Sequence, residues 1–115
     1  MSSLARGQIW LVNLDPTVGA EIQKTRPALI ISNDLNNQYS LTVTVIPISD
    51  KGEKVYPIEV LLSSKATGLI KPSKARCQQI RTVDKSRLIK QLGAATEEEL
   101  KAVNNALCIH LGIIF

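Results

Sequence analysis

The sequence predicts a small α+β protein of five to seven short strands followed by one C-terminal helix. Residues 41–48 (LTVTVIPI) alternate Thr with aliphatic residues, which is the period of a half-buried strand. Residues 27–32 (PALIIS) are a mostly aliphatic run of strand length. After Thr96 the apolar residues recur at helical spacing instead. At 115 residues the chain suits one domain, residues 1–115, without a repeat or a linker.

The N-terminal half contains three predicted strands separated by polar segments. Residues 8–14 (QIWLVNL) form the first strand, and Pro16 and Gly19 end it in a turn. A polar loop then leads to Pro27, which opens the second strand at a position where its missing N–H does little harm. Residues 33–40 read as a polar connection. Pro47, near the end of the third strand, indicates a sheet edge or a bulge, and the charged residues 49–56 form a loop.

The C-terminal half contains two further strands and the helix. Residues 57–62 and about 75–80 are the strands, residues 68–72 form a turn, and residues 83–89 are ambiguous. Thr96 and Glu99 have the spacing of a capping box, in which each side chain binds the other residue's backbone N–H. The apolar stripe of the helix comprises Leu100, Val103, Leu107 and Leu111.

The composition argues against a disordered chain. Apolar residues make up 44% and charged residues 21%, which is typical of a folded globular chain. The net charge of +4 and the pI of about 9.3 are compatible with an anionic partner. With one Trp, two Tyr and one Phe, the chain cannot build a long aromatic row for stacking bases.

The few potential metal ligands are scattered. Cys77, Cys108 and the single His do not have the spacing of a zinc site, so we expect buried reduced thiols and no cofactor. The first six residues have no apolar signal stretch, and no run approaches the ~20 residues that cross a bilayer, which indicates a cytoplasmic protein.

Four segments, in this order and at these spacings, resemble the MazF/PemK family of toxin endoribonucleases from type II toxin–antitoxin systems. They are residues 6–21 (RGQIWLVNLDPTVGAE), 24–34 (KTRPALIISND), 47–49 (PIS) and 79–85 (QIRTVDK). The resemblance covers nearly the whole chain. It implies an SH3-like β-barrel with a C-terminal helix, a homodimer, and sequence-specific cleavage of single-stranded RNA, with mRNA as the expected target. It also implies a cognate antitoxin as partner, with contact to DNA only through the antitoxin complex.

The resemblance assigns three catalytic candidates. RNA supplies its own nucleophile, the ribose 2′-OH, so the protein must move protons and stabilise a phosphorane, which needs no metal. Arg26 matches the family's essential arginine, whose planar fork suits a phosphate. Ser49 matches the hydroxyl position after the third strand. Glu21 matches the acidic residue of a G-x-E step, where it orients Arg26, accepts the 2′-OH proton, or forms a structural ion pair with Arg26. The expected products carry a 2′,3′-cyclic phosphate and a 5′-hydroxyl.

Five further residues are predicted to contact RNA: Asn33, Arg76, Gln78, Gln79 and Arg81. Some relatives have an acidic residue where this chain has Gln78, so a general base is not available at that position. We expect the amides of Gln78 and Gln79 to read base edges instead, and Arg76 and Arg81 to contact phosphates or the groove. Asn33 has an ordinary alternative role in an Asx-turn.

The alternative function is a non-catalytic one on the same barrel. Such a protein binds nucleic acid or antitoxin, or poisons a protein target such as gyrase. Arg26, Ser49 and Glu21, in their motif contexts, favour the nuclease, because a gyrase poison has no need of a phosphate-binding arginine at that step.

Overall fold

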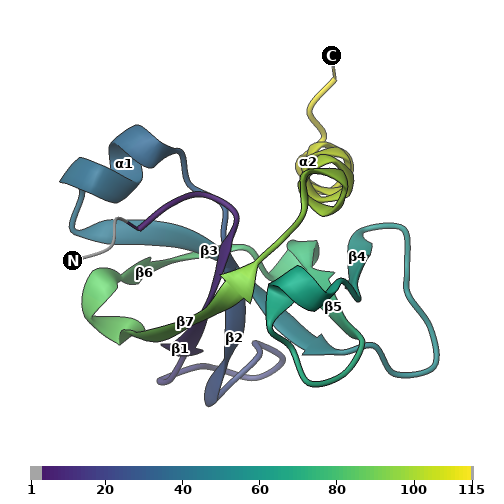
Figure 1. Ribbon diagram of the computed structural model, residues 1–115, viewed down its shortest axis with the longest axis horizontal. Helices are drawn as coiled ribbons and strands as arrows, with labels where there is room; N and C mark the ends of the chain where they lie inside the picture. The colour runs from purple at the N-terminus through teal and green to yellow at the C-terminus, as the bar shows by residue number, and fades with distance from the viewer. Residues whose placement is uncertain (1–3, 115) are drawn as a thin grey trace.

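The alternating segments form seven strands that make one antiparallel sheet, in the order β4-β5-β3-β2-β1-β7, with β6 also paired to β3 (Figure 1). The strands are β1 (Gln8–Asn13), β2 (Thr25–Ile30), β3 (Thr42–Asp50), β4 (Glu59–Leu62), β5 (Ser73–Arg76), β6 (Arg81–Asp84) and β7 (Leu88–Ala94). The computed structural model describes residues 4–114, so Phe115 and the first three residues of the N-terminal stretch lie outside it. Within that range the sheet path ends at β4 and β7, so the sheet is open and the expected barrel is only a loose description. The predicted α+β class is confirmed.

Pro47 lies in the central strand, so the predicted sheet edge is wrong. On one side β3 pairs with β2, including Ala28 with Pro47. On its other side β3 pairs first with β6, through Thr42–Val45, and then with β5, through Ile48–Asp50. Pro47 falls in the gap between these two partners, where the missing N–H breaks no ladder. The 3₁₀ turn η2 (Cys77–Gln79) connects β5 to β6 beside this gap.

Residues 4–114 also contain two α-helices, α1 (Asp34–Tyr39) and α2 (Glu97–Leu111), and two further 3₁₀ turns, η1 (Lys65–Thr67) and η3 (Lys85–Arg87). The predicted polar connection at residues 33–40 is therefore a short helix, and the ambiguous residues 83–89 are divided between β6, η3 and β7. The strand expected near residues 75–80 ends at Arg76 instead, and η2 follows it. Within residues 4–114 neither helix has the length and apolar character of a membrane span.

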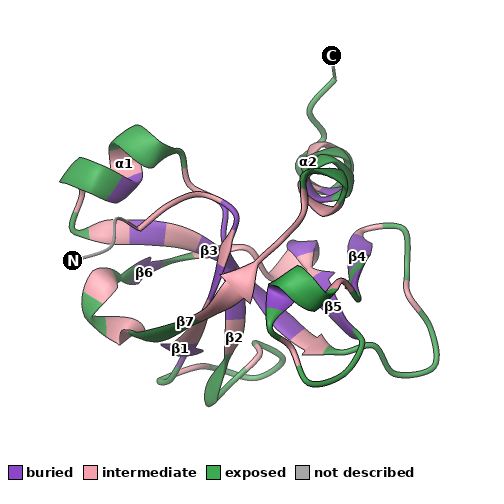
Figure 2. Cartoon of the chain, in the orientation of Figure 1, coloured by how far each residue is buried: buried purple, intermediate pink, exposed green. Residues whose placement is uncertain are grey.

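Two apolar clusters occupy opposite faces of the sheet. One contains Ile9, Leu29 and Ile46 and is covered by α2, through Val103 and Ala106. The cores of the strands are accordingly buried, whereas α1 and most loops are exposed (Figure 2). From the predicted stripe Leu100 and Leu107 pack against this cluster, but Leu111 is 52% exposed, so the stripe ends one turn earlier than expected.

The second cluster lies on the other face and includes Ala28, Ile30, Val43 and Val45. Ile22, from the loop between β1 and β2, packs against this cluster. This loop (residues 14–24) therefore folds over the second face of the sheet.

The capping box forms as predicted, and of the two thiols expected to be buried Cys77 is buried but Cys108 is not. Thr96 caps α2, with Glu99 N–H donating to Thr96 Oγ1 at 3.2 Å and Thr96 N–H donating to Glu99 Oε1 at 2.9 Å. Cys77 is buried, Cys108 is half-buried and both are free. Burial raises the pKa of the Cys77 thiol to about 11, so Cys77 stays a neutral core residue.

Candidate active site

The candidate site lies on the face of the second cluster, where β2, β3 and β5 run side by side. Directly paired residues of antiparallel strands point to the same face. The β2–β3 pairing ends at Ala28–Pro47. Arg26 and Ser49 each lie two residues beyond that pair along their own strands, so by alternation both side chains are on its face. On its other side Ser49 pairs with Lys74 of β5. The register thus brings a guanidinium, a hydroxyl and an ammonium to one face of the sheet.

The same face continues along β5 to Arg76. Arg76 lies two residues after Lys74, so both side chains share the face, and Arg76 pairs with Glu59 of β4. Lys74 and Glu59 are buried, whereas Arg76 is half-buried. A basic strip therefore runs from Arg26 through Ser49 to Arg76, with one carboxylate beneath it.

Arg26 and Ser49 keep most of their hydrogen-bonding capacity free. Arg26 is exposed, and its Nε donates to the Gln23 carbonyl at 3.2 Å. Ser49 is half-buried, and its hydroxyl makes one long hydrogen bond, to the Asp50 carbonyl at 3.3 Å. Among residues 4–114 no further partner binds the terminal nitrogens of Arg26. Both groups are available to an anion that approaches the face.

Glu21 is not bound to Arg26. Its Oε1 accepts a hydrogen bond from the Val18 N–H at 2.6 Å, which closes a turn within the β1–β2 loop. In the described part of the chain the ion pairs are Lys71–Asp50, Lys74–Glu59 and Arg76–Glu59. The structural ion pair considered for Glu21 and Arg26 is therefore not formed, and the carboxylate shapes the loop instead.

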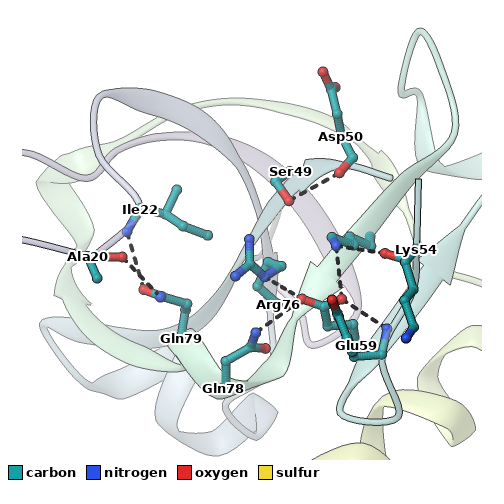
Figure 3. A network of polar contacts seen from close by, with 11 residues as sticks. Ala20, Ile22, Ser49, Asp50, Lys54, Glu59, Arg76, Gln78 and Gln79 are labelled. Atoms are coloured by element: carbon teal, nitrogen blue, oxygen red, sulfur yellow. Dashed lines mark hydrogen bonds and ion pairs between the residues drawn. The ribbon is translucent and has the colours of Figure 1, made fainter. Parts of the chain in front are cut away.

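Glu59 is the centre of a buried polar network (Figure 3). Its Oε1 lies 2.9 Å from Lys74 Nζ and accepts from the Tyr56 N–H at 3.1 Å. Its Oε2 lies 2.7 Å from Arg76 Nε and accepts from Gln78 Nε2 at 3.1 Å. Burial alone opposes ionisation, but the donors from Lys74, Tyr56 and Gln78 outweigh it and lower the pKa of Glu59 to about 2. The carboxylate is thus an anion at neutral pH.

Gln79 and Arg81 hold the β1–β2 loop. Gln79 Oε1 accepts from the Ile22 N–H at 3.2 Å, and Nε2 donates to the Ala20 carbonyl at 3.3 Å (Figure 3). Arg81 Nη1 donates to the Leu14 carbonyl at 3.1 Å. Both side chains, which were expected to contact RNA, are used to fix the loop that borders the site.

Asn33 lies away from this face. Its side chain accepts from the Asn36 N–H at 2.8 Å and caps α1, and α1 lies on the opposite side of the molecule from β4 and β5 (Figure 1). The sequence offered an Asx-turn for this residue, and the structure shows a related local role, the N-cap of α1. The structure does not bring Asn33 together with Arg26, Ser49 and Arg76.

Sequence reasoning missed Glu59 and Lys74. The signal was present, because Glu59 is an acid within the apolar stretch of residues 58–62 (IEVLL). A buried charge needs a partner, and Lys74 and Arg76 have the two-residue spacing that places both on one face of a neighbouring strand. The cations, the hydroxyl and the free edges of the guanidinium groups together form a surface suited to a phosphate group.

Comparison with known proteins identifies relatives of this chain. A protein-family model described as PemK-like, MazF-like toxin of type II toxin–antitoxin system matches residues 5–111. Endoribonuclease MazF9 of Mycobacterium tuberculosis is 39% identical, with 96% of this chain and 98% of that protein aligned. Endoribonuclease MazF of Staphylococcus saprophyticus is also 39% identical, over 96% of this chain and 92% of that protein. The crystal structure of MazF from Deinococcus radiodurans has a TM-score of 0.85 at 25% identity, covering 98% of this chain and 100% of that chain.

Proposed function

The chain belongs to the PemK-like, MazF-like family of toxins from type II toxin–antitoxin systems, and from this premise we propose that it is an endoribonuclease that cleaves single-stranded RNA. Two relatives at 39% identity over nearly their whole length are named endoribonucleases. The observation that carries the proposal for this chain is the strip formed by Arg26, Ser49 and Arg76, which presents hydrogen-bond donors on one open face.

The proposed reaction is an attack of the ribose 2′-OH on the adjacent phosphate. The new bond joins the 2′-oxygen to phosphorus as the 2′-OH loses its proton to water, and the bond to the 5′-oxygen breaks as that oxygen takes up a proton. The products carry a 2′,3′-cyclic phosphate and a 5′-hydroxyl. Charge on the nonbridging oxygens grows as the phosphorane forms, so fixed donors bind the transition state more strongly than the substrate. Arg26 and Arg76 supply charged donors, and Ser49 supplies a neutral one.

The roles of the remaining candidates follow from their contacts. Glu21, Gln79 and Arg81 hold the β1–β2 loop beside the strip, so in this conformation they act on the substrate through the loop. Reading of a base edge by Gln78 or Gln79 stays a prediction that requires each amide to leave its present partner. We further propose a cognate antitoxin as partner, a homodimer as the active form and the cytoplasm as its location. One structural relative is an endoribonuclease solved in complex with its cognate antitoxin.

The test compares the wild type with Arg26→Ala on a long single-stranded RNA in the presence of EDTA. Cut ends are mapped by primer extension, and their chemistry is read by whether kinase can label the 5′ ends directly. Cleavage at one short sequence by the wild type, with a loss of at least 10²-fold in the variant, is the expected result. A wild type that arrests growth and leaves RNA intact would overturn the proposal in favour of a protein target.

A further inference from the structure

Glu59 is the most enclosed charged side chain near the site, and its oxygens are fully occupied. The side chain is 2% exposed, and four groups surround its two oxygens: Tyr56 N–H, Lys74 Nζ, Arg76 Nε and Gln78 Nε2. A carboxylate that is almost fully buried and enclosed by four nitrogen groups cannot reach a substrate. Any effect it has on the reaction must pass through the residues that it holds.

Arg76 is the residue through which such an effect passes. Its Nε is buried and lies 2.7 Å from Glu59 Oε2, without the alignment of a hydrogen bond, so charge attraction holds this contact. Within residues 4–114 no group binds the two terminal nitrogens, and these point away from Glu59 (Figure 3). One edge of the guanidinium is therefore anchored and the other is open.

Neither of the other polar side chains around Arg76 can hold it in place, so Glu59 is its anchor. Lys74 cannot take this role, because it is itself a cation and is bound to Glu59 and to the Lys54 carbonyl at 3.0 Å. Gln78 donates to the same carboxylate, which leaves its Oε1 buried without a hydrogen-bond partner. Removing the negative charge would leave two cations facing each other across a buried space, and Arg76 would turn outward to solvent.

We propose that Glu59 is a positioning residue of the ribonuclease site, which clamps Nε of Arg76 so that its two terminal nitrogens face the scissile phosphate. This inference rests on the proposed function and extends it to a residue that never touches RNA. It explains why an acid lies within an apolar strand under a basic strip. It also fits an arginine at position 76, because a planar guanidinium can place Nε against Glu59 on one edge and keep its terminal nitrogens on the other, a separation that the compact ammonium of lysine lacks.

The test is a double-mutant cycle on kcat, with wild type, Glu59→Gln, Arg76→Met and the combined variant acting on a short RNA that contains the mapped cut site. We expect Arg76→Met to lower kcat by about 10²-fold and Glu59→Gln by about 10-fold. The combined variant should be no slower than Arg76→Met alone, because the effect of Glu59 passes through Arg76. The KM should change much less than kcat in each case.

Glu99→Gln is the matched control, because Glu99 is also a multiply bonded carboxylate but holds Ser64 Oγ and the cap of α2. It should lose stability and keep kcat. Assays are run at a temperature where circular dichroism shows every variant folded. Arg76→Lys supplies a second measurement that leaves Glu59 intact, and it should be as slow as Arg76→Met.

Each failure is distinguishable. If the wild type does not cleave RNA, the proposed function and this inference fall together. If the wild type is active and the two losses multiply in the combined variant, or Arg76→Lys retains full kcat, Glu59 does not act through Arg76. If Glu59→Gln removes the acid limb of the kcat–pH profile between pH 5 and 8, Glu59 transfers a proton and the positioning role is wrong.

Discussion

Gln79 binds Ile22 across 57 positions of sequence, with its Oε1 accepting the backbone N–H at 3.2 Å. The other end of the same amide donates to the Ala20 carbonyl at 3.3 Å. A primary amide that meets a backbone N–H and a backbone C=O in this way copies the pairing of a β-ladder. The β1–β2 loop is thus attached to η2 by one side chain, and Ile22 stays packed against the second cluster.

Gln79→Ala should therefore release the loop and leave the sheet intact. We expect the Ile22 amide to exchange its hydrogen at least 10-fold faster, because the one acceptor that residues 4–114 offer it is removed. Hydrogen exchange followed by NMR measures this directly. Gln78→Ala is the control, since the neighbouring amide binds Glu59 instead, and it should leave exchange at Ile22 unchanged. Equal exchange in the wild type and Gln79→Ala would show that the loop is held by other contacts.

Ser49→Ala should reduce cleavage without reducing stability. The hydroxyl makes a single hydrogen bond of 3.3 Å, so its loss costs the fold little. A hydrogen bond to a charged group contributes about 1.5–3 kcal/mol, so kcat should fall roughly 10- to 100-fold. Ser49→Thr keeps the hydroxyl and should retain most of the activity. A fully active Ser49→Ala would remove the hydroxyl from the proposed chemistry.

The strands and the cap were predictable because their determinants are local. The strand at residues 41–48 is recognised from the alternation of polar and apolar residues within that segment alone. The capping box is likewise recognised from the four consecutive residues Thr96 to Glu99. α1 has no such apolar signal. Its Leu35 and Tyr39 are 72% and 74% exposed, and its buried residue is Asn37, which donates to the Ser32 carbonyl at 2.8 Å. A helix stabilised by polar contacts does not produce an amphipathic pattern.

The candidate site was predictable only in part, because residue identity does not reveal which partner a side chain binds. Arg26 and Ser49 share one face of the sheet, and their catalytic roles stay a prediction. Gln79 and Arg81 have the right chemistry for RNA, but in the folded chain they bind backbone groups of the β1–β2 loop. Glu59 stands out in the sequence as an acid in an apolar stretch, but its partner Arg76 is identified only by the β4–β5 register, which joins residues 17 positions apart.

The stability of the protein should depend on pH through Glu59. Its pKa is about 2 in the folded protein and 4.5 as an unperturbed group, so the folded state favours the anion. The resulting stability is fully present above pH 4.5 and is lost as the pH falls towards 2, by about 3 kcal/mol. Urea denaturation at several pH values measures this. In Glu59→Gln the free energy of unfolding should be lower at pH 7, and its difference from wild type should shrink towards pH 2. A difference that is constant with pH would contradict the assignment.

Position 93 needs glycine because there is no room for a side chain, and not because of its backbone conformation. A Cβ on Gly93 would lie 2.3 Å from the Ala66 carbonyl oxygen and 2.4 Å from that of Thr67, where η1 packs on β7. Gly52 is the opposite case, with a φ of +65° and nothing within 4 Å of the added atom. Gly52→Ala should therefore cost only backbone strain, about 1 kcal/mol. Gly93→Ala must move η1 away from β7 and should cost about 3 kcal/mol, at the upper end for overpacking. Thermal denaturation of the two variants side by side compares these costs, and equal losses would mean that η1 shifts without penalty.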